Sequence, residues 1–166
     1  MTTATATQSL KSLAFEALLD YYVGRGTLAR NPDGLSAYED MFGNRDPIGF
    51  LLFGLGVTSQ QLRALPRIGV SRLLKARTPE LGKLTETFGL HFLCILQAAH
   101  EHALTHPTDV GFLAFLEFLR LGALGGLEAN LDWWTAMCPP DQPPRLGGVT
   151  ATIDIAVDRV RTKGLV

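Results

Sequence analysis

Apolar residues recur every three or four positions along residues 85–105, in the middle of the chain. Side chains at these intervals share one face of an α-helix. The pattern stops at Pro107, which lacks a backbone N–H and disfavours helical geometry in the residue before it. We therefore predict a helix that ends by about Thr105. Its apolar face is formed by Phe88, Phe92, Ile95, Leu96 and Ala99.

The next stretch, residues 110–131, is apolar on almost every side. Such a helix is either buried in a protein or embedded in a membrane. Glu117 and Arg120 interrupt it, so no run approaches the roughly 18 uncharged residues that a membrane span needs. We predict a central core helix at 110–131, capped by the carboxylate of Asp109. Gly122 has no side chain, and would either let a second helix approach closely or kink this one.

Shorter helical patterns flank this pair, and several of them begin with typical capping residues. Thr58 opens a capping box, and Thr78 followed by Pro79 is a typical helix start. Asn31–Gly34 is a strong turn signal, and residues 37–42 after it favour a short helical turn. The predicted short helices are 9–23, 47–53, 58–65, 70–76 and one that begins at 78. The apolar stripe of the first comprises Leu10, Leu13, Ala14, Ala17, Leu18 and Tyr21.

Residues 150–163 near the C-terminus fit two structures. Their alternating β-branched residues suit a strand, whereas Ile153, Val157 and Val160 form a helical stripe. We favour the helix because no other segment offers a partner strand.

The predicted fold is all-α, a compact bundle of about six to eight helices around the central helix 110–131. Residues 1–8 are predicted to be a disordered N-terminus, and residues 9–166 to form a single helical domain.

Composition narrows the function classes without selecting one. The chain has 166 residues, of which 46% are hydrophobic and 19% charged, and a net charge of −1, as in ordinary globular proteins. That balance gives no whole-chain argument for binding to nucleic acid or membranes. Cys94 and Cys138 are too few for a disulfide framework, and the first residues lack the features of a signal peptide. We therefore expect a cytoplasmic protein with reduced thiols and no membrane association.

The order of several segments resembles that of small helical proteins encoded by phages and bacteria. The matching pieces are Asn31–Gly34 with Tyr38, then Pro47–Leu52, then Leu96–Glu101, then the apolar stretch Phe112–Leu127. The first three correspond to a Gly/Asn loop with a tyrosine, a short apolar glycine segment and a Leu-Gln-x-x-His-acid run. The resemblance covers about residues 10–127 and implies a helical fold. It implies no function and no catalytic residue.

All four histidines lie between residues 91 and 106. His102 and His106 are four apart, which on a continuous helix places both on one face, as a metal site requires. Glu101 could add an oxygen ligand. The same spacing also fits histidines near a helix C-terminus, where the dipole favours a partly positive side chain. Gln97 lies four residues before Glu101, and the two are predicted to hydrogen-bond on the helix surface.

The segment between Pro47 and Pro79 contains basic residues and no acidic residue. Residues 62–74 resemble a helix-hairpin-helix turn, in which backbone amides hold a nucleic-acid phosphate, and also fit a helix-turn-helix. The predicted nucleic-acid contacts are Arg67, Gly69, Arg72 and Lys75. The competing interpretation is a solvated basic face on two short helices.

The sequence contains no GxSxG, P-loop, GxGxxG or CxxC motif. It therefore predicts no cofactor. We predict a non-enzymatic protein that acts by self-association or by binding a protein partner, because residues 112–127 hold more apolar surface than one small core absorbs. The alternatives are a weak, sequence-independent nucleic-acid binder and a metal-dependent enzyme or sensor that uses the cluster His91–His106.

Overall fold

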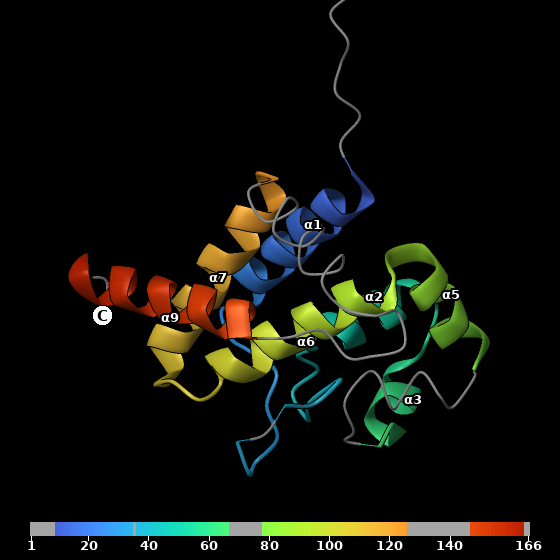
Figure 1. Cartoon of the computed structure of the whole chain (residues 1–166). Helices are drawn as coiled ribbons and strands as arrows, with labels where there is room; N and C mark the ends of the chain where they lie inside the picture. The colour runs from blue at the N-terminus through green and yellow to red at the C-terminus, as the bar shows by residue number, and fades with distance from the viewer. Residues whose placement is uncertain (1–8, 35, 67–77, 126–146, 165–166) are drawn as a thin grey trace, which may run out of the picture.

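The computed structural model describes residues 9–34, 36–66, 78–125 and 147–164 (Figure 1). In these ranges it contains helices and one isolated β-bridge but no strand, which confirms the all-α prediction. The helices are α1 (Leu10–Arg25), α2 (Pro47–Gly54), α3 (Ser59–Ala64), α5 (Pro79–Phe88), α6 (Leu90–Ala103), α7 (Thr108–Ala123) and α9 (Gly147–Thr162). No helix in the described ranges combines the length and the apolar character that crossing a membrane requires.

Helix α7 is the buried element that the sequence predicts, and it packs against α1, α6 and α9 (Figure 1). A Cβ atom on Gly122 would lie 2.3 Å from the ring of Phe15, so this glycine permits the close approach of α1 to α7. The predicted C-terminal limit at residue 131 is wrong. Helix α7 ends at Ala123, where Leu124 takes the cap position and Gly125 adopts a φ of 74°. Residues 126–131 lie outside the described ranges.

The predicted cap of α7 is also wrong by two positions. Pro107 occupies the N-cap position and Asp109 lies inside the first turn. The carboxylate of Asp109 still lies at the positive end of the helix dipole.

The buried face of α1 is rotated from the predicted stripe. Phe15 and Tyr22 are completely buried, whereas Leu10 and Leu13 are 53% and 45% exposed. Aromatic side chains bury the largest areas, so they set which face of a helix turns inward. Ala14 and Leu18 of the predicted stripe are buried and Tyr21 is partly buried, so the leucine spacing predicted the buried face only in part.

The predicted helices 9–23, 47–53 and 58–65 correspond to α1, α2 and α3, whereas the predicted helix 70–76 and the predicted disordered residues 1–8 lie outside the described ranges. Thr58 forms the capping box of α3, and Thr78 caps α5. Gly89, with a φ of 78°, separates α5 from α6. The segment 150–163 is helical, as favoured, and forms most of α9.

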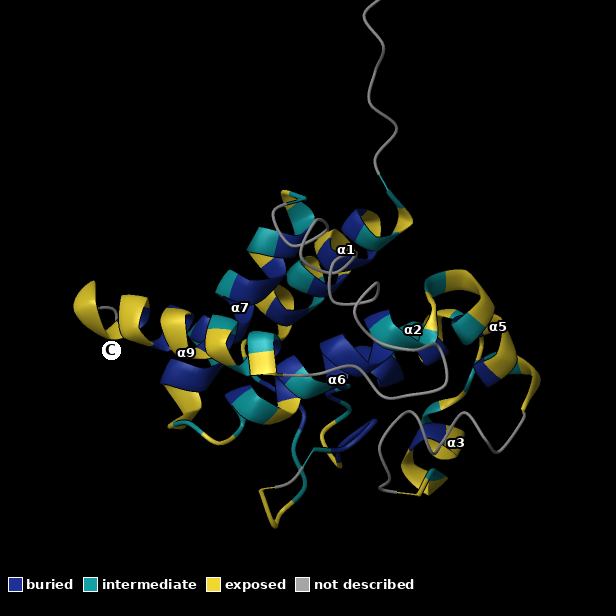
Figure 2. Ribbon diagram, viewed as in Figure 1, coloured by how far each residue is buried: buried dark blue, intermediate teal, exposed yellow. Residues whose placement is uncertain are grey.

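One contiguous apolar core receives side chains from every one of these helices. Figure 2 shows that α6 is buried along most of its length, whereas α5 and α9 each expose one side. The predicted helical turn at 37–42 is absent: the loop instead folds back on itself through a β-bridge between Glu39 and Arg45. That loop lies against α2, α3 and α6, and it forms the candidate site.

Candidate functional site: an acidic cavity

The loop between α1 and α2 is held by the carboxylate of Asp40, which is 2% exposed. One oxygen of Asp40 accepts from the backbone amides of Phe42 at 2.8 Å and Asn44 at 2.9 Å. The other accepts from the side-chain amide of Asn44 at 2.9 Å. A carboxylate with several such donors is well satisfied in a buried position. Asp40 therefore stabilises the conformation of this loop.

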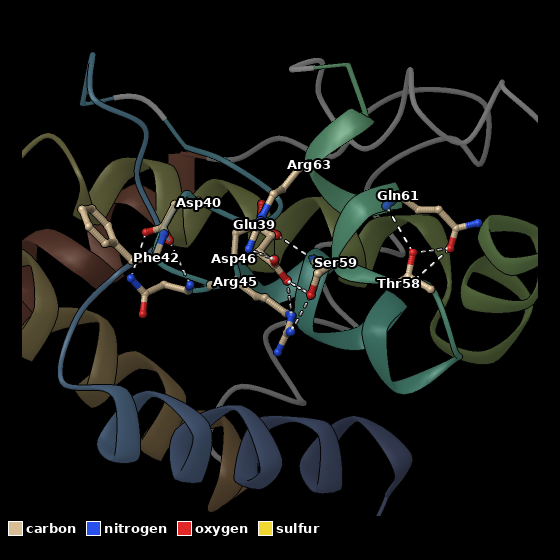
Figure 3. A network of polar contacts seen from close by, with 12 residues as sticks. Glu39, Asp40, Phe42, Arg45, Asp46, Thr58, Ser59, Gln61 and Arg63 are labelled. Atoms are coloured by element: carbon tan, nitrogen blue, oxygen red, sulfur yellow. Dashed lines mark hydrogen bonds and ion pairs between the residues drawn. The ribbon is translucent and has the colours of Figure 1, made fainter.

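Glu39 ties the same loop to α3, and its side chain is completely buried (Figure 3). It forms ion pairs with Arg45 at 2.8 Å and with Arg63 at 2.9 Å. It also accepts from the hydroxyl of Ser59 at 3.0 Å. A buried carboxylate needs both charge partners and hydrogen bonds, and Glu39 has both.

Two tyrosines of α1 fix the other side of the loop at the backbone of Arg45. The hydroxyl of Tyr22 donates to the carbonyl of Arg45 at 2.8 Å, and the amide of Arg45 donates to the hydroxyl of Tyr21 at 2.7 Å. The guanidinium of Arg45 lies 3.5 Å from the ring centroid of Phe53, a cation–π contact. The residue that follows, Asp46, is thereby held in place.

Asp46 is the N-cap of α2 and is 1% exposed. Its Oδ1 accepts from the amide of Gly49 at 2.7 Å. The pKa of Asp46 is raised to about 7, mainly by burial and then by the nearby charge of Glu101, against the opposing effect of hydrogen bonds from Gly49, Ile48 and Ser36. Asp46 thus differs from Glu39, because no cation among the described residues pairs with it, and from Asp40, because it lines the cavity described next.

The loop, α3 and the C-terminal half of α6 surround a cavity of about 720 Å³. This volume is within the range of small-molecule sites. Four acidic side chains line it, against one basic side chain from the described residues, Arg63, which pairs with Glu39. The acidic residues are Asp33, Glu39, Asp46 and Glu101.

Helix α6 contributes Gln97 and Glu101 to the wall of this cavity. Gln97 is 8% exposed and hydrogen-bonds to Tyr38 across the cavity. The predicted surface position of Gln97 is therefore wrong, because tertiary contacts place it inside, whereas its hydrogen bond with Glu101 stays a prediction. Glu101 is the more exposed of the two, and partial burial raises the pKa of its carboxyl group.

Two of the segments that carried the resemblance line this cavity. Residues of the Asn31–Gly34 turn line it together with Tyr38 and with Gln97 and Glu101 from the Leu96–Glu101 run. Gly49, in the apolar segment, is packed so tightly that a Cβ atom would lie 1.8 Å from the carbonyl oxygen of Tyr38. Only a glycine fits there.

His100 belongs to the core behind the cavity. It is completely buried, and its ring packs against Tyr22 and Phe115. Its Nδ1 lies 3.3 Å from the hydroxyl of Ser36, which also hydrogen-bonds to Asp46. Burial, and then the charge of Arg30, lower the pKa of His100 to about 3, so the ring is neutral.

The predicted metal ligands separate into two groups. His102 and His106 lie together, with ring centroids 5.3 Å apart, whereas Glu101 lines the acidic cavity. Asp154 of α9 takes the place predicted for Glu101: its Oδ1 is 2.8 Å from His102 Nε2 and 3.3 Å from His106 Nε2. The hydrogen bond from His102 lowers the pKa of Asp154.

The predicted nucleic-acid contacts Arg67, Gly69, Arg72 and Lys75 all lie outside the described residues. Arg63, the one basic residue of that segment within the described ranges, forms an ion pair with Glu39. Nucleic-acid binding therefore remains a prediction.

Self-association also remains a prediction. Most large apolar side chains of α7 lie in the core or pack against it, and Leu124 just beyond the helix is 84% exposed. The apolar surface that motivated this prediction is thus largely covered within the chain.

Comparisons of this chain with protein-family models, with curated proteins and with solved structures find no match. The functional argument therefore depends on the geometry of the site.

Proposed function

We propose that the protein binds a small organic cation, an amine or a guanidinium compound, in the acidic cavity, with Asp46 and Glu101 as its anionic partners. The observation that supports this most directly is the position of these two carboxyl groups. Both line a cavity of about 720 Å³, and neither pairs with a cation among the described residues. A carboxylate that lacks a charge partner in a partly buried site favours a ligand that supplies one.

The rest of the wall suits an organic ligand more than a bare ion. Leu62, Leu65 and Leu104 contribute apolar surface, and Tyr38 and Gln97 contribute polar groups. Small-molecule sites combine these two features, with apolar walls and a few polar groups that orient the ligand. A metal ion without an organic part would fill little of such a volume.

The raised pKa of Asp46 gives the proposal a pH dependence. A cation interacts favourably with the ionised carboxylate, which predominates above a pKa of about 7. Affinity should therefore increase as the pH rises from 5.5 to 8.

Isothermal titration calorimetry at pH 8 with butylamine, 1,4-diaminobutane and guanidinium chloride tests the proposal, with sodium chloride at matched ionic strength and calcium chloride as comparisons. We expect saturable binding of at least one organic cation. Glu101→Gln and Asp46→Asn should each weaken it at least about tenfold. Asp46→Asn keeps a cap oxygen for Gly49, so helix α2 should remain intact.

Glu117→Gln is the matched control, because Glu117 lies on α7 and pairs with Arg120 on the surface. This variant should bind like the wild type. The proposal is overturned if none of the organic cations binds, if calcium binds and they do not, or if Glu101→Gln and Asp46→Asn leave the affinity unchanged.

A further inference from the structure

A second cluster of polar side chains lies at the junction of α6, α7 and α9, apart from the acidic cavity with Asp46 and Glu101. It consists of His102, His106 and Asp154. Each offers one ligand atom, and the three atoms all lie within 4.8 Å of one another. Two imidazoles and one carboxylate form a donor set that transition metals use in proteins.

The backbone explains why the two histidines meet. Helix α6 ends at Ala103, but hydrogen bonds from the amide of Thr105 to His102 and from the amide of His106 to Ala103 continue the turn. His106 therefore lies on the same face as His102, as it would in a continuous helix. Pro107 then redirects the chain into α7.

Helix α9 supplies the third ligand from a distant part of the sequence. Ile153 and Val157 are buried against the core and fix the helix, and Asp154 points from the adjacent position toward the histidines. Its side chain is 55% exposed, so it has room to adjust. All three side chains thus project from well-packed elements, which favours a defined site.

The Nε2 atom of His106 is buried and makes no hydrogen bond within the described residues. It lies 3.3 Å from Oδ1 of Asp154, within ion-pair distance. Two ligands of a tetrahedral ion with bonds of about 2.0–2.1 Å are separated by roughly the same distance. Such an ion would give Nε2 of His106 a binding partner.

We propose that His102, His106 and Asp154 bind a divalent transition-metal ion of the zinc type. Nitrogen ligands disfavour magnesium and calcium, which prefer oxygen. Three protein ligands leave at least one coordination position for water, and the side chains are only partly buried. The Nε2 atom of His102, which lies 2.8 Å from Asp154 Oδ1, must be unprotonated to bind the ion.

The test uses the full chain, purified without a histidine tag and stripped with a chelating resin. Zinc is titrated against a competing chromophoric chelator, and cobalt(II) absorption reports the coordination. We expect one zinc ion per chain, and a cobalt spectrum typical of a site with nitrogen and oxygen ligands. His102→Gln, His106→Gln and Asp154→Asn should each weaken zinc binding at least about tenfold.

Three matched controls separate this site from other arrangements. His91→Gln removes a histidine from the same helix, Asp158→Asn removes an acid one turn further along α9, and Glu101→Gln removes the acid adjacent to His102 in sequence. All three should keep zinc affinity. The variants are compared by circular dichroism without metal, so that a folding defect is recognised.

Two results overturn the proposal. One is the absence of saturable zinc binding to the wild type. The other is an equivalent of zinc that persists with unchanged affinity in His106→Gln and Asp154→Asn. If His102→Gln unfolds, the decision rests on Asp154→Asn, because the side chain of Asp154 is 55% exposed.

Discussion

The apolar core around α7 and the polar loop of residues 27–46 bury their side chains by different means. In the core, Phe15, Phe115 and Phe118 pack edge to face or stacked. In the loop, the carboxylates of Glu39 and Asp40 are buried among several donors each. Asp46 is as deeply buried and lines the cavity, but its hydrogen-bond donors are uncharged, whereas Glu39, which lines the same cavity, pairs with two arginines. This contrast suggests that Glu39 and Asp40 hold the structure together, while Asp46 remains available for a ligand.

The largest loss of stability should come from the core. Phe115→Ala removes a completely buried ring that contacts Tyr22, His100 and Phe118, and should lower the free energy of unfolding by about 3–5 kcal/mol. The matched control is Phe42→Ala in the polar loop, where the ring is 75% exposed, and which should cost less than about 0.5 kcal/mol. Urea denaturation measures both. Similar losses in the two variants would contradict the assigned core.

Replacement by alanine should have different effects on stability at the two glycines of α2. In Gly49→Ala the new Cβ meets the backbone carbonyl of Tyr38, which cannot rotate away, so the loss should reach about 3 kcal/mol. Nothing lies within 4 Å of the corresponding position on Gly54, so Gly54→Ala should be neutral or slightly stabilising. Thermal unfolding of the two variants decides the matter, and equal melting temperatures would refute the close contact between the loop and α2.

Removal of the Asp40 carboxylate should cause a somewhat smaller loss of stability. Asp40→Ala leaves two backbone amides and the Asn44 side chain without their acceptor, and should destabilise the protein by about 2–3 kcal/mol. Asp20→Ala, on the exposed side of α1, should change little. Denaturant unfolding with amide hydrogen exchange of residues 40–46 measures the loss and its location. Unchanged exchange in the Asp40 variant would argue against this role.

The dependence of stability on pH should distinguish Asp46 from the other carboxylates. Its pKa is raised to about 7 in the folded protein, so between pH 4 and 7 the folded state binds a proton that the unfolded state has released. The contribution of Asp46 to stability therefore decreases as the pH rises through this range. The lowered pKa of His100 acts oppositely, since stability falls as the pH drops below about 6.5.

Comparing the wild type with Asp46→Asn isolates the contribution of Asp46 to the pH dependence of stability, because both proteins contain His100. The stability of the variant relative to the wild type should increase from pH 4 to pH 7. A constant difference, measured by denaturant unfolding at several pH values, would show that Asp46 ionises normally.

The helices were predictable because their signals are local. Spacing and caps such as Thr58 and Thr78 placed most elements, and the histidine spacing brought His102 and His106 together correctly. The C-terminal limit of α7 was missed because apolar residues continue beyond Gly125, whose positive φ ends the helix. The face of α1 was predicted only in part, because the contact of Phe15 with Gly122 helps to decide which side turns inward.

The candidate site depends on tertiary contacts that no local pattern contains. Asp154 lies 52 residues from His102, and nothing in its own neighbourhood marks it as a partner. Asp46 did carry a signal, since an aspartate directly before a proline that opens a helix is a typical N-cap. Its burial could not be read from that pattern, because burial results from the packing of the loop against α1, α2 and α6.

The proposed function requires the carboxylate of Asp46 to pair with the positive charge of the ligand. At pH 6 most Asp46 side chains carry a proton, so binding of 1,4-diaminobutane should release close to one proton per site. Calorimetry in two buffers with different ionisation enthalpies measures that number directly. The account predicts a release near one proton in the wild type and most of it lost in Asp46→Asn. Binding with no proton release, or with the same release in the variant, would contradict it.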